Sequence, residues 1–215
     1  MIIWVAEKCE KVLGKKLVYV ATDDERIHSK VKEFGFQTIP TSKNCLTGTD
    51  RVAEASELLN ADIYINVQGD EPLIEPEDIK KVIDEKLKYP DHVICGYNEV
   101  LRTENPLNKN IPKVVLNENN ELIYISRSLV PGSKNENLPN KNSYFKQVCI
   151  YAFNKKELRK FYLFGRKSVI EQSEDIEILR FFELNIKIKM VKTISKSLAI
   201  DHENDIKKVE NFLKQ

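Results

Sequence analysis

Hydrophobic and polar positions alternate over the first ninety residues in a way that predicts strands and helices in turn. Short apolar runs typical of buried strands lie at 17–21, 36–39 and 62–67. Stretches with helical periodicity lie at 1–16, 24–34, 49–59 and 76–88. Gly14 and Gly35 stand where helices commonly end. This spacing predicts right-handed βαβ units and a mostly parallel sheet flanked by helices, so the fold class is α/β.

The segment from about 92 to 153 has a different pattern. Its strand-like runs lie at 92–101, 113–117, 122–126 and 147–153, and polar turns rather than helices separate them. We expect antiparallel strands here, added to the edge of the sheet or forming a small lobe. The remaining elements are helices at 155–164 and 173–184, an exposed edge strand at 186–193 and an amphipathic helix at 203–214. With no repeat or linker, residues 1–215 are predicted to form one domain.

Composition narrows the class of protein. The 215 residues carry 34 Lys and Arg against 33 Asp and Glu, a formal net charge of +1. This balance argues against a general nucleic-acid or membrane-surface binder, which usually has an excess of basic residues. The four cysteines are scattered, and no apolar run approaches the roughly 18 residues of a membrane span. We expect a cytoplasmic enzyme without a nucleic-acid or membrane partner.

Several well-known motifs are missing from the sequence. The seven glycines contain no G-x-G pair, so the dinucleotide-binding fingerprint is absent. Neither a phosphate-binding G-x-x-x-x-G-K-[ST] loop nor a G-x-S-x-G nucleophile turn occurs. Carboxylates are therefore the main candidates for chemistry.

Two aspartates stand at positions that suit a metal ion. Asp70 follows the strand ending at Val67, at the sheet edge where open α/β folds bind ligands. Gly69 would allow a sharp turn there, and the carboxylate suits Mg²⁺, which favours oxygen ligands. Asp201 precedes the last predicted helix. Each has a structural alternative, since Asp70 could cap a turn and Asp201 could be a helix N-cap.

Consecutive sequence blocks point to one known family. V-A-T-D-D-E-R-I at 20–27, T-G-T-D-R-V-A-E at 47–54 and V-Q-G-D-E-P at 67–72 resemble 3-deoxy-manno-octulosonate cytidylyltransferases, also called CMP-Kdo synthetases. Later blocks keep the family order at 113–115, 124–127, 150–151, 174–180 and 200–201. The similarity covers nearly the whole chain, and V-Q-G-D-E-P is its most specific part.

This resemblance implies a fold, a reaction and partners. The family has a Rossmann-like α/β fold, with the antiparallel segment 92–153 as the dimerisation lobe of a homodimer. Its members use CTP to activate a sugar acid, most simply 3-deoxy-D-manno-octulosonate (Kdo), and release pyrophosphate for lipopolysaccharide or capsule synthesis. By resemblance, Asp70 and Asp201 would be the catalytic Mg²⁺ ligands. Mg²⁺ would then neutralise charge at the α-phosphate and lower the pKa of the sugar hydroxyl.

The resemblance also assigns binding residues. Gly48, Thr49 and Arg51 would contact the nucleotide, where the planar guanidinium of arginine suits phosphates. The expected sugar-binding residues are Gln68, Gln147, Tyr151 and Glu177. Arg127 is a weaker match. Two alternatives stay open: Arg51 could form a salt bridge with Asp50 or Glu54, and Tyr151 could simply be packed in the core.

The chain departs from the family pattern at three places. Family members open with a strand and a loop whose Arg and Lys hold the triphosphate, and this sequence begins after them. We therefore expect a longer reading frame, an inactive chain or completion by a partner. Gln147 replaces a histidine and Ile178 replaces a glutamine, which suggests a looser sugar pocket or another sugar acid. Other readings are a cytidylyltransferase for an acylneuraminate-like acid, a dimerising pseudoenzyme and a metal-dependent glycosyltransferase.

Overall fold

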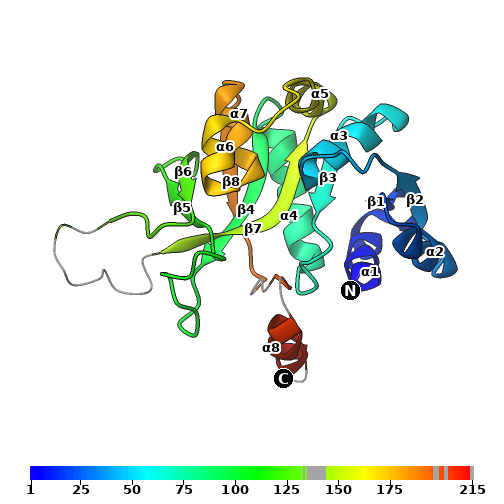
Figure 1. Cartoon of the computed structure of the whole chain (residues 1–215), viewed down its shortest axis with the longest axis horizontal. Coiled ribbons are helices and arrows are strands. Elements are labelled where there is room, and N and C mark those ends of the chain that lie inside the picture. Colours follow the sequence, from blue (N-terminus) through cyan, green and yellow to red (C-terminus); the bar gives the residue numbers. More distant parts are fainter. Residues whose placement is uncertain (133, 135–143, 196–198, 201–202, 214–215) are drawn as a thin grey trace.

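A computed structural model describes residues 1–132, 134, 144–195, 199–200 and 203–213. Two sheets are flanked by helices (Figure 1). In the larger sheet the strands run β6-β5-β7-β4-β8, and β3 pairs with β7 as well. Its members are β3 (Tyr64–Val67), β4 (Val93–Glu99), β5 (Lys113–Leu116), β6 (Leu122–Ser126), β7 (Phe145–Phe153) and β8 (Ile188–Lys192).

The larger sheet is organised around β7. Its first residues pair with β5 and its last four with β3, while β4 runs antiparallel along the other edge. Among the ladders of the described residues, β4–β8 and β1–β2 are parallel and the others are antiparallel. The α/β class and the antiparallel pairing within 92–153 are confirmed. The sheet is mixed rather than mostly parallel, because β7 runs through its middle antiparallel to the neighbouring strands β3, β4 and β5.

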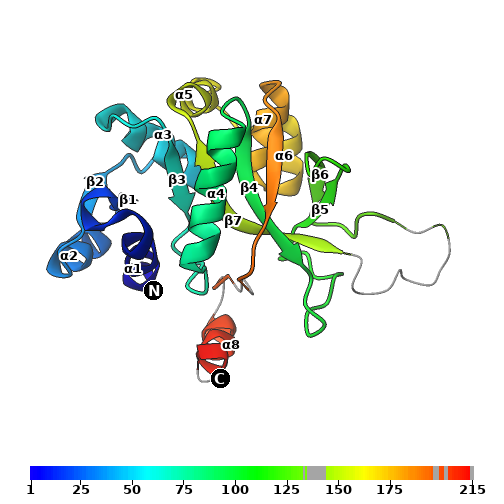
Figure 2. The same cartoon turned by 180° about the vertical axis from the view of Figure 1, so that it is seen from behind.

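Helices cover both faces of this sheet. On one face, α1 (Ile2–Leu13) and α4 (Pro76–Lys88) pack on even-numbered residues of β7, including Val148 and Ile150 (Figure 2). The opposite face carries α3 (Gly48–Leu58), α5 (Lys155–Leu163) and the segment after it. The main core there includes Tyr151 and Phe153 from β7. Each face of β7 thus has its own apolar cluster, as strand periodicity requires.

The first part of the chain forms a smaller unit. Its elements are η1 (Lys15–Leu17), β1 (Tyr19–Thr22), α2 (Glu25–Glu33) and β2 (Gln37–Pro40). Val18, Val20, Val31 and Phe36 form its core together with α1. Gly14 and Gly35 adopt φ of 76° and 73°, which confirms the two predicted helix ends. The side chain of Cys9 in α1 packs against both this core and the sheet, so α1 joins the two units.

The helix predicted at 173–184 is wrong. Three short elements replace it: α6 (Val169–Glu174), η3 (Glu177–Leu179) and α7 (Arg180–Glu183). Ser168 and Glu171 form a capping box that starts α6, and Asp175 ends it in the left-handed conformation, with φ of 51°. This break turns the chain so that Glu177 and Arg180 can reach α3.

The last part of the chain contains one further correction. β8 is buried rather than exposed, with Ile188 and Met190 in the main core. Lys189 between them is also buried, and its ammonium donates to the carbonyl of Asn119, which satisfies its charge in part. The final predicted helix is α8 (Glu203–Leu213). None of the helices in the described residues is long and apolar enough to cross a bilayer.

Candidate functional site

The V-Q-G-D-E-P block forms a tight turn at the end of β3. The Gln68 amide donates to the Cys149 carbonyl at 3.2 Å, and the Glu71 amide closes the turn on the Gln68 carbonyl at 3.2 Å. Gly69 is not in the left-handed region, so the sharp turn expected of it is not the reason for glycine. A Cβ at Gly69 would lie 3.0 Å from Ile2 Cδ1. The glycine therefore allows α1 to pack closely on the turn.

Asp70 lies beside the chain that leads to Asp201. The Ile200 amide donates to the Asp70 carbonyl oxygen at 3.0 Å. Upstream, the carboxylate of Asp78 in α4 accepts the amides of Ile194 and Ser195 at 2.7 and 2.9 Å, which anchors this segment. Asp201 itself is outside the described residues, so its part in a metal site stays a prediction.

The surroundings of Asp70 are electronegative. Burial raises the pKa of the Cys149 thiol well above its usual range, and the nearby carboxylates of Glu71 and Asp70 raise it further. Glu71 is 2% exposed and accepts the Cys149 amide at 3.2 Å. Carboxylate oxygens are the hard ligands that a divalent cation prefers. Within the described residues no three His, Cys, Asp or Glu side chains converge on a possible metal position.

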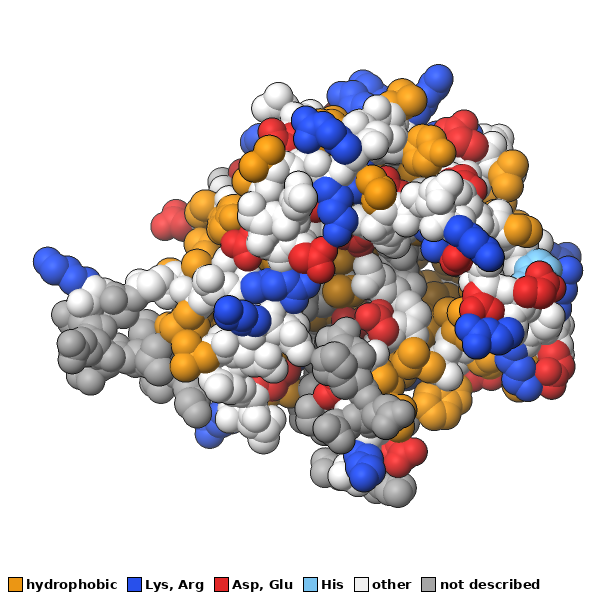
Figure 3. All heavy atoms as spheres, viewed as in Figure 1, with side chains coloured by type: hydrophobic (Ala, Val, Ile, Leu, Met, Phe, Trp, Pro, Cys, Tyr) orange, Lys and Arg blue, Asp and Glu red, His pale blue; other side chains and the backbone are white. Residues whose placement is uncertain are grey.

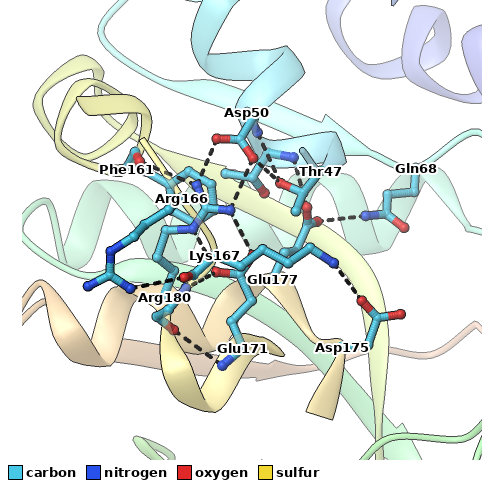
Figure 4. Close-up of polar contacts among 12 residues, drawn as sticks. Thr47, Asp50, Gln68, Phe161, Arg166, Lys167, Glu171, Asp175, Glu177 and Arg180 are labelled. Atoms are coloured by element: carbon cyan, nitrogen blue, oxygen red, sulfur yellow. Dashed lines mark hydrogen bonds and ion pairs between the residues drawn. The ribbon is translucent and has the colours of Figure 1, made fainter. Parts of the chain in front are cut away.

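Glu177 lies beside three of the other predicted residues, and Figure 4 shows its contact with Gln68. Its Oε1 accepts the Gln68 side-chain amide at 2.8 Å, and its Oε2 accepts the Thr49 backbone amide at 2.9 Å. A Cβ at Gly48 would lie 3.4 Å from Gln68 Nε2 and 3.7 Å from Glu177 Oε2. The structure thus brings together Gly48, Thr49, Gln68 and Glu177. We call these four residues the Glu177 junction.

The pKa of Glu177 is raised, chiefly because burial penalises its ionised form. Hydrogen bonds from Thr49 and Thr47 oppose the shift, and the charge of Asp50 adds to it. A carboxyl with a raised native pKa holds its proton to higher pH than in the unfolded chain. Its contribution to the free energy of unfolding is therefore largest at low pH and declines as pH rises through the native pKa.

The substitution Glu177→Gln should remove that decline. We expect the free energy of unfolding of the variant to rise relative to that of the wild type as pH increases from 4.5 to 7.5. Urea denaturation at several pH values measures it. Glu183→Gln, the same change at an exposed residue of the neighbouring α7, is the control. A difference that is constant over this range would contradict the raised pKa.

Gln147 and Tyr151 lie together on one face of β7. The Gln147 side-chain amide donates to the Tyr151 hydroxyl at 3.0 Å and lies 3.7 Å from Cys95 Sγ. Tyr151 is 1% exposed and stacks on Phe153, with ring centroids 5.9 Å apart. Burial raises the pKa of its hydroxyl well above the usual range. Tyr151 is therefore packed in the core, which was the alternative to a sugar-binding role. Its hydroxyl also has a polar partner in Gln147.

Arg51 contacts the smaller unit rather than the Glu177 junction. Its guanidinium lies 2.9 Å from the Asp23 carboxylate, just after β1, and donates to the Thr41 hydroxyl, just after β2. The alternative of a structural salt bridge is thus met by Asp23 and not by Asp50 or Glu54, since Asp50 pairs with Arg180 and Glu54 accepts from Ser42 and Cys45. The Arg51 side chain is 23% exposed.

A buried triad of charged residues, which the sequence did not reveal, lies next to the Glu177 junction at the start of α3. Arg180 is fully buried and lies 2.7 Å from both Asp50 and Glu171. Its guanidinium also stands 3.8 Å from the ring centroid of Phe161. Asp50 directly follows Thr49, so this triad fixes the start of α3. Both Asp50 and Arg180 fall in sequence blocks that match the family, but no local signal pairs them.

Arg127 and Ile178, two further positions singled out by the resemblance, have roles in packing and in joining segments of the chain. Arg127 donates to the backbone carbonyls of Lys109, Glu174 and Asp175, so it links the loop at Lys109 to the end of α6. Ile178 is fully buried in the main core. Its replacement of the family's glutamine therefore changes the core rather than an open polar pocket.

Comparisons with known proteins agree with this arrangement. A family model described as "Cytidylyltransferase" matches residues 1–188, which places the chain in that class of enzymes. The 3-deoxy-manno-octulosonate cytidylyltransferase of Fusobacterium nucleatum is 38% identical, over 100% of this chain and 86% of that protein. The Escherichia coli enzyme of the same name is 32% identical, with the same coverage. The chain belongs to the 3-deoxy-manno-octulosonate cytidylyltransferase family, and the resemblance is confirmed.

Solved structures give the same result. The structure of CMP:2-keto-3-deoxy-manno-octonic acid synthetase complexed with CTP matches with a TM-score of 0.87 and 32% identity. The match covers 100% of this chain and 87% of that one. The 4-diphosphocytidyl-2C-methyl-D-erythritol synthase of Anaerococcus prevotii shares the fold, with a TM-score of 0.64 and 16% identity.

Proposed function

We propose that this protein uses CTP to activate a sugar acid, most simply Kdo, giving the CMP-sugar and pyrophosphate for lipopolysaccharide or capsule synthesis. The Glu177 junction carries this proposal. It links residues expected at the nucleotide to residues expected at the sugar, and Asp70 follows Gln68 by two positions. Figure 3 shows the surface hollowed between the six-stranded sheet and the smaller unit, next to this edge of the sheet. Family membership supports the same reaction.

Asp70 is proposed to hold the divalent cation, Mg²⁺, with Asp201 as a second ligand. When bound, the cation would supply charge neutralisation at the α-phosphate and a lower pKa for the sugar hydroxyl. The carboxylates of Asp70 and Glu71 make this turn electronegative, and the Ile200 amide anchors it through the Asp70 carbonyl. Both features suit this role. No protein general base is then needed.

The remaining roles follow from position. Gly48 lies against Gln68 and Glu177, close enough that a Cβ there would be in van der Waals contact with both. Arg51 supplies positive charge on the side of the smaller unit, where we place the phosphates of CTP. Gln68, Glu177 and the Gln147–Tyr151 pair are proposed to line the sugar side.

We also propose a cytoplasmic homodimer that uses the lobe 92–153. Two large apolar side chains of this lobe, Leu107 and Ile123, are each 56% exposed. Such side chains are stabilised when a second copy covers them. Sedimentation velocity at micromolar concentration tests the dimer, and a monomer at all concentrations would contradict it.

The reaction itself is tested by pyrophosphate release from CTP with a panel of sugar acids. We expect release that depends on Mg²⁺ and is fastest with Kdo. Faster turnover of another acid, such as an acylneuraminate, would support the alternative specificity that Gln147 suggests. Turnover of none of them by a full-length, folded protein would favour a dimerising pseudoenzyme.

A further inference from the structure

Asn66 is a polar side chain in the middle of a buried strand surface. It lies in β3 directly opposite Tyr151 of β7 and is 8% exposed. Tyr64, two residues before it, belongs to the main core, whereas Ile65 and Val67 pack on the other face. The two-residue period of a strand therefore places Asn66 on the same face as Tyr151 and Gln68.

The side-chain amide of Asn66 lacks an internal partner. Its Nδ2 is buried and has no hydrogen-bond partner among the residues that the structure describes. A buried donor without a partner costs roughly 1 to 3 kcal/mol, and such groups are rare in native proteins. An apolar residue would pack at this position without that cost. The amide therefore calls for a partner from outside the chain, a bound water or a ligand.

The neighbouring amides are already engaged. Gln68 donates to Glu177 at 2.8 Å, and Gln147 donates to the Tyr151 hydroxyl at 3.0 Å. Asn66 lies opposite Tyr151 and about 7 Å along the strand from Gln68. Of these three side-chain amides, Asn66 is the one whose nitrogen makes no hydrogen bond within the described residues. Arg51, the proposed phosphate contact, lies on the side of the smaller unit, where it pairs with Asp23, and is not part of this group of amides.

We propose that Asn66 binds the sugar acid by donating a side-chain hydrogen bond to one of its oxygen atoms. This inference rests on the proposed function and adds a substrate-binding residue to the sugar side of the site. The ligand chemistry required is an oxygen acceptor, a hydroxyl, carbonyl or carboxylate of the sugar, held on the face shared by Gln68 and Tyr151.

The substitution Asn66→Val separates this role from a structural one. Valine favours strands and removes the buried, unpaired amide, so the melting temperature should stay the same or rise. The kcat/KM for the sugar acid should fall about tenfold, because one hydrogen bond to the substrate is lost. The KM for CTP should remain within about twofold of the wild-type value. Thermal denaturation and pyrophosphate release measure these quantities.

Thr38→Val is the matched control. Thr38 Oγ1 is also buried without a partner in the described residues, but it lies in β2 of the smaller unit. This variant should share the effect on melting temperature and leave the sugar kinetics unchanged. A clear drop in the melting temperature of Asn66→Val, unchanged sugar kinetics, or a rise confined to the KM for CTP would each overturn the proposal. A wild-type protein that turns over no sugar acid would instead refute the proposed function.

Discussion

The substitution Asp70→Asn should reduce sugar-dependent pyrophosphate release by about a thousandfold. Asparagine keeps the size and turn preference of aspartate but removes the charge that holds a divalent cation. A cation at a developing negative charge contributes several kcal/mol to the transition state, and each 1.4 kcal/mol is about a factor of ten in rate. The anchoring of this turn by the Ile200 amide uses the Asp70 backbone, so the substitution should leave the fold intact.

Titration with Mg²⁺ makes this test specific. The residual activity of Asp70→Asn should need a much higher Mg²⁺ concentration, while its melting temperature without metal stays near the wild-type value. Asp62→Asn is the control, since Asp62 is exposed just before the start of β3 and loses the same charge. Unchanged turnover by Asp70→Asn would show that Asp70 only caps the turn, because asparagine caps equally well.

Local patterns predicted most elements and failed where distant segments decide the structure. The period of the apolar residues is a local property, so the strands and helices of the first ninety residues were found within a few positions. The role of β7 could not be found in this way. Its apolar character does not say that it pairs with β5, β4 and β3, and these pairings make the sheet mixed.

The candidate site shows the same division. Asp70 and Gln68 were found from a short motif after a strand, and the structure places them on one turn. The family resemblance assigned Gln68 and Glu177 to the sugar, but their contact is known only from the structure, since 109 residues separate them. The helix predicted through Glu177 was wrong because Asp175 adopts the left-handed conformation, which sequence periodicity does not reveal. The unpaired amide of Asn66 likewise becomes visible only when its surroundings are known.

The largest effect on stability is expected at Arg180. Substitution by methionine keeps the aliphatic stem but leaves the buried carboxylates of Asp50 and Glu171 without their cation. Breaking a buried ion pair by removing one partner typically costs about 3 to 5 kcal/mol. Urea denaturation at pH 7 should show a loss of unfolding free energy in this range. Lys167→Met is the control, because its ion pair with Asp175 is exposed and worth less than about 1 kcal/mol (Figure 4).

Lost packing is a second source of this loss, because the Arg180 guanidinium also lies 3.8 Å from the ring centroid of Phe161.

A variant that lacks all three charges tests whether the protein needs these charges themselves or only needs them to be paired. The triple variant Asp50→Asn, Glu171→Gln and Arg180→Met leaves no uncompensated ion, so it should recover a large part of the stability that Arg180→Met loses. Its catalysis should not recover to the same extent. Asp50 follows Thr49, whose amide binds Glu177, and the charged triad fixes this end of α3. A stable triple variant with weak turnover would show that the triad positions the site, whereas full activity would limit its role to folding.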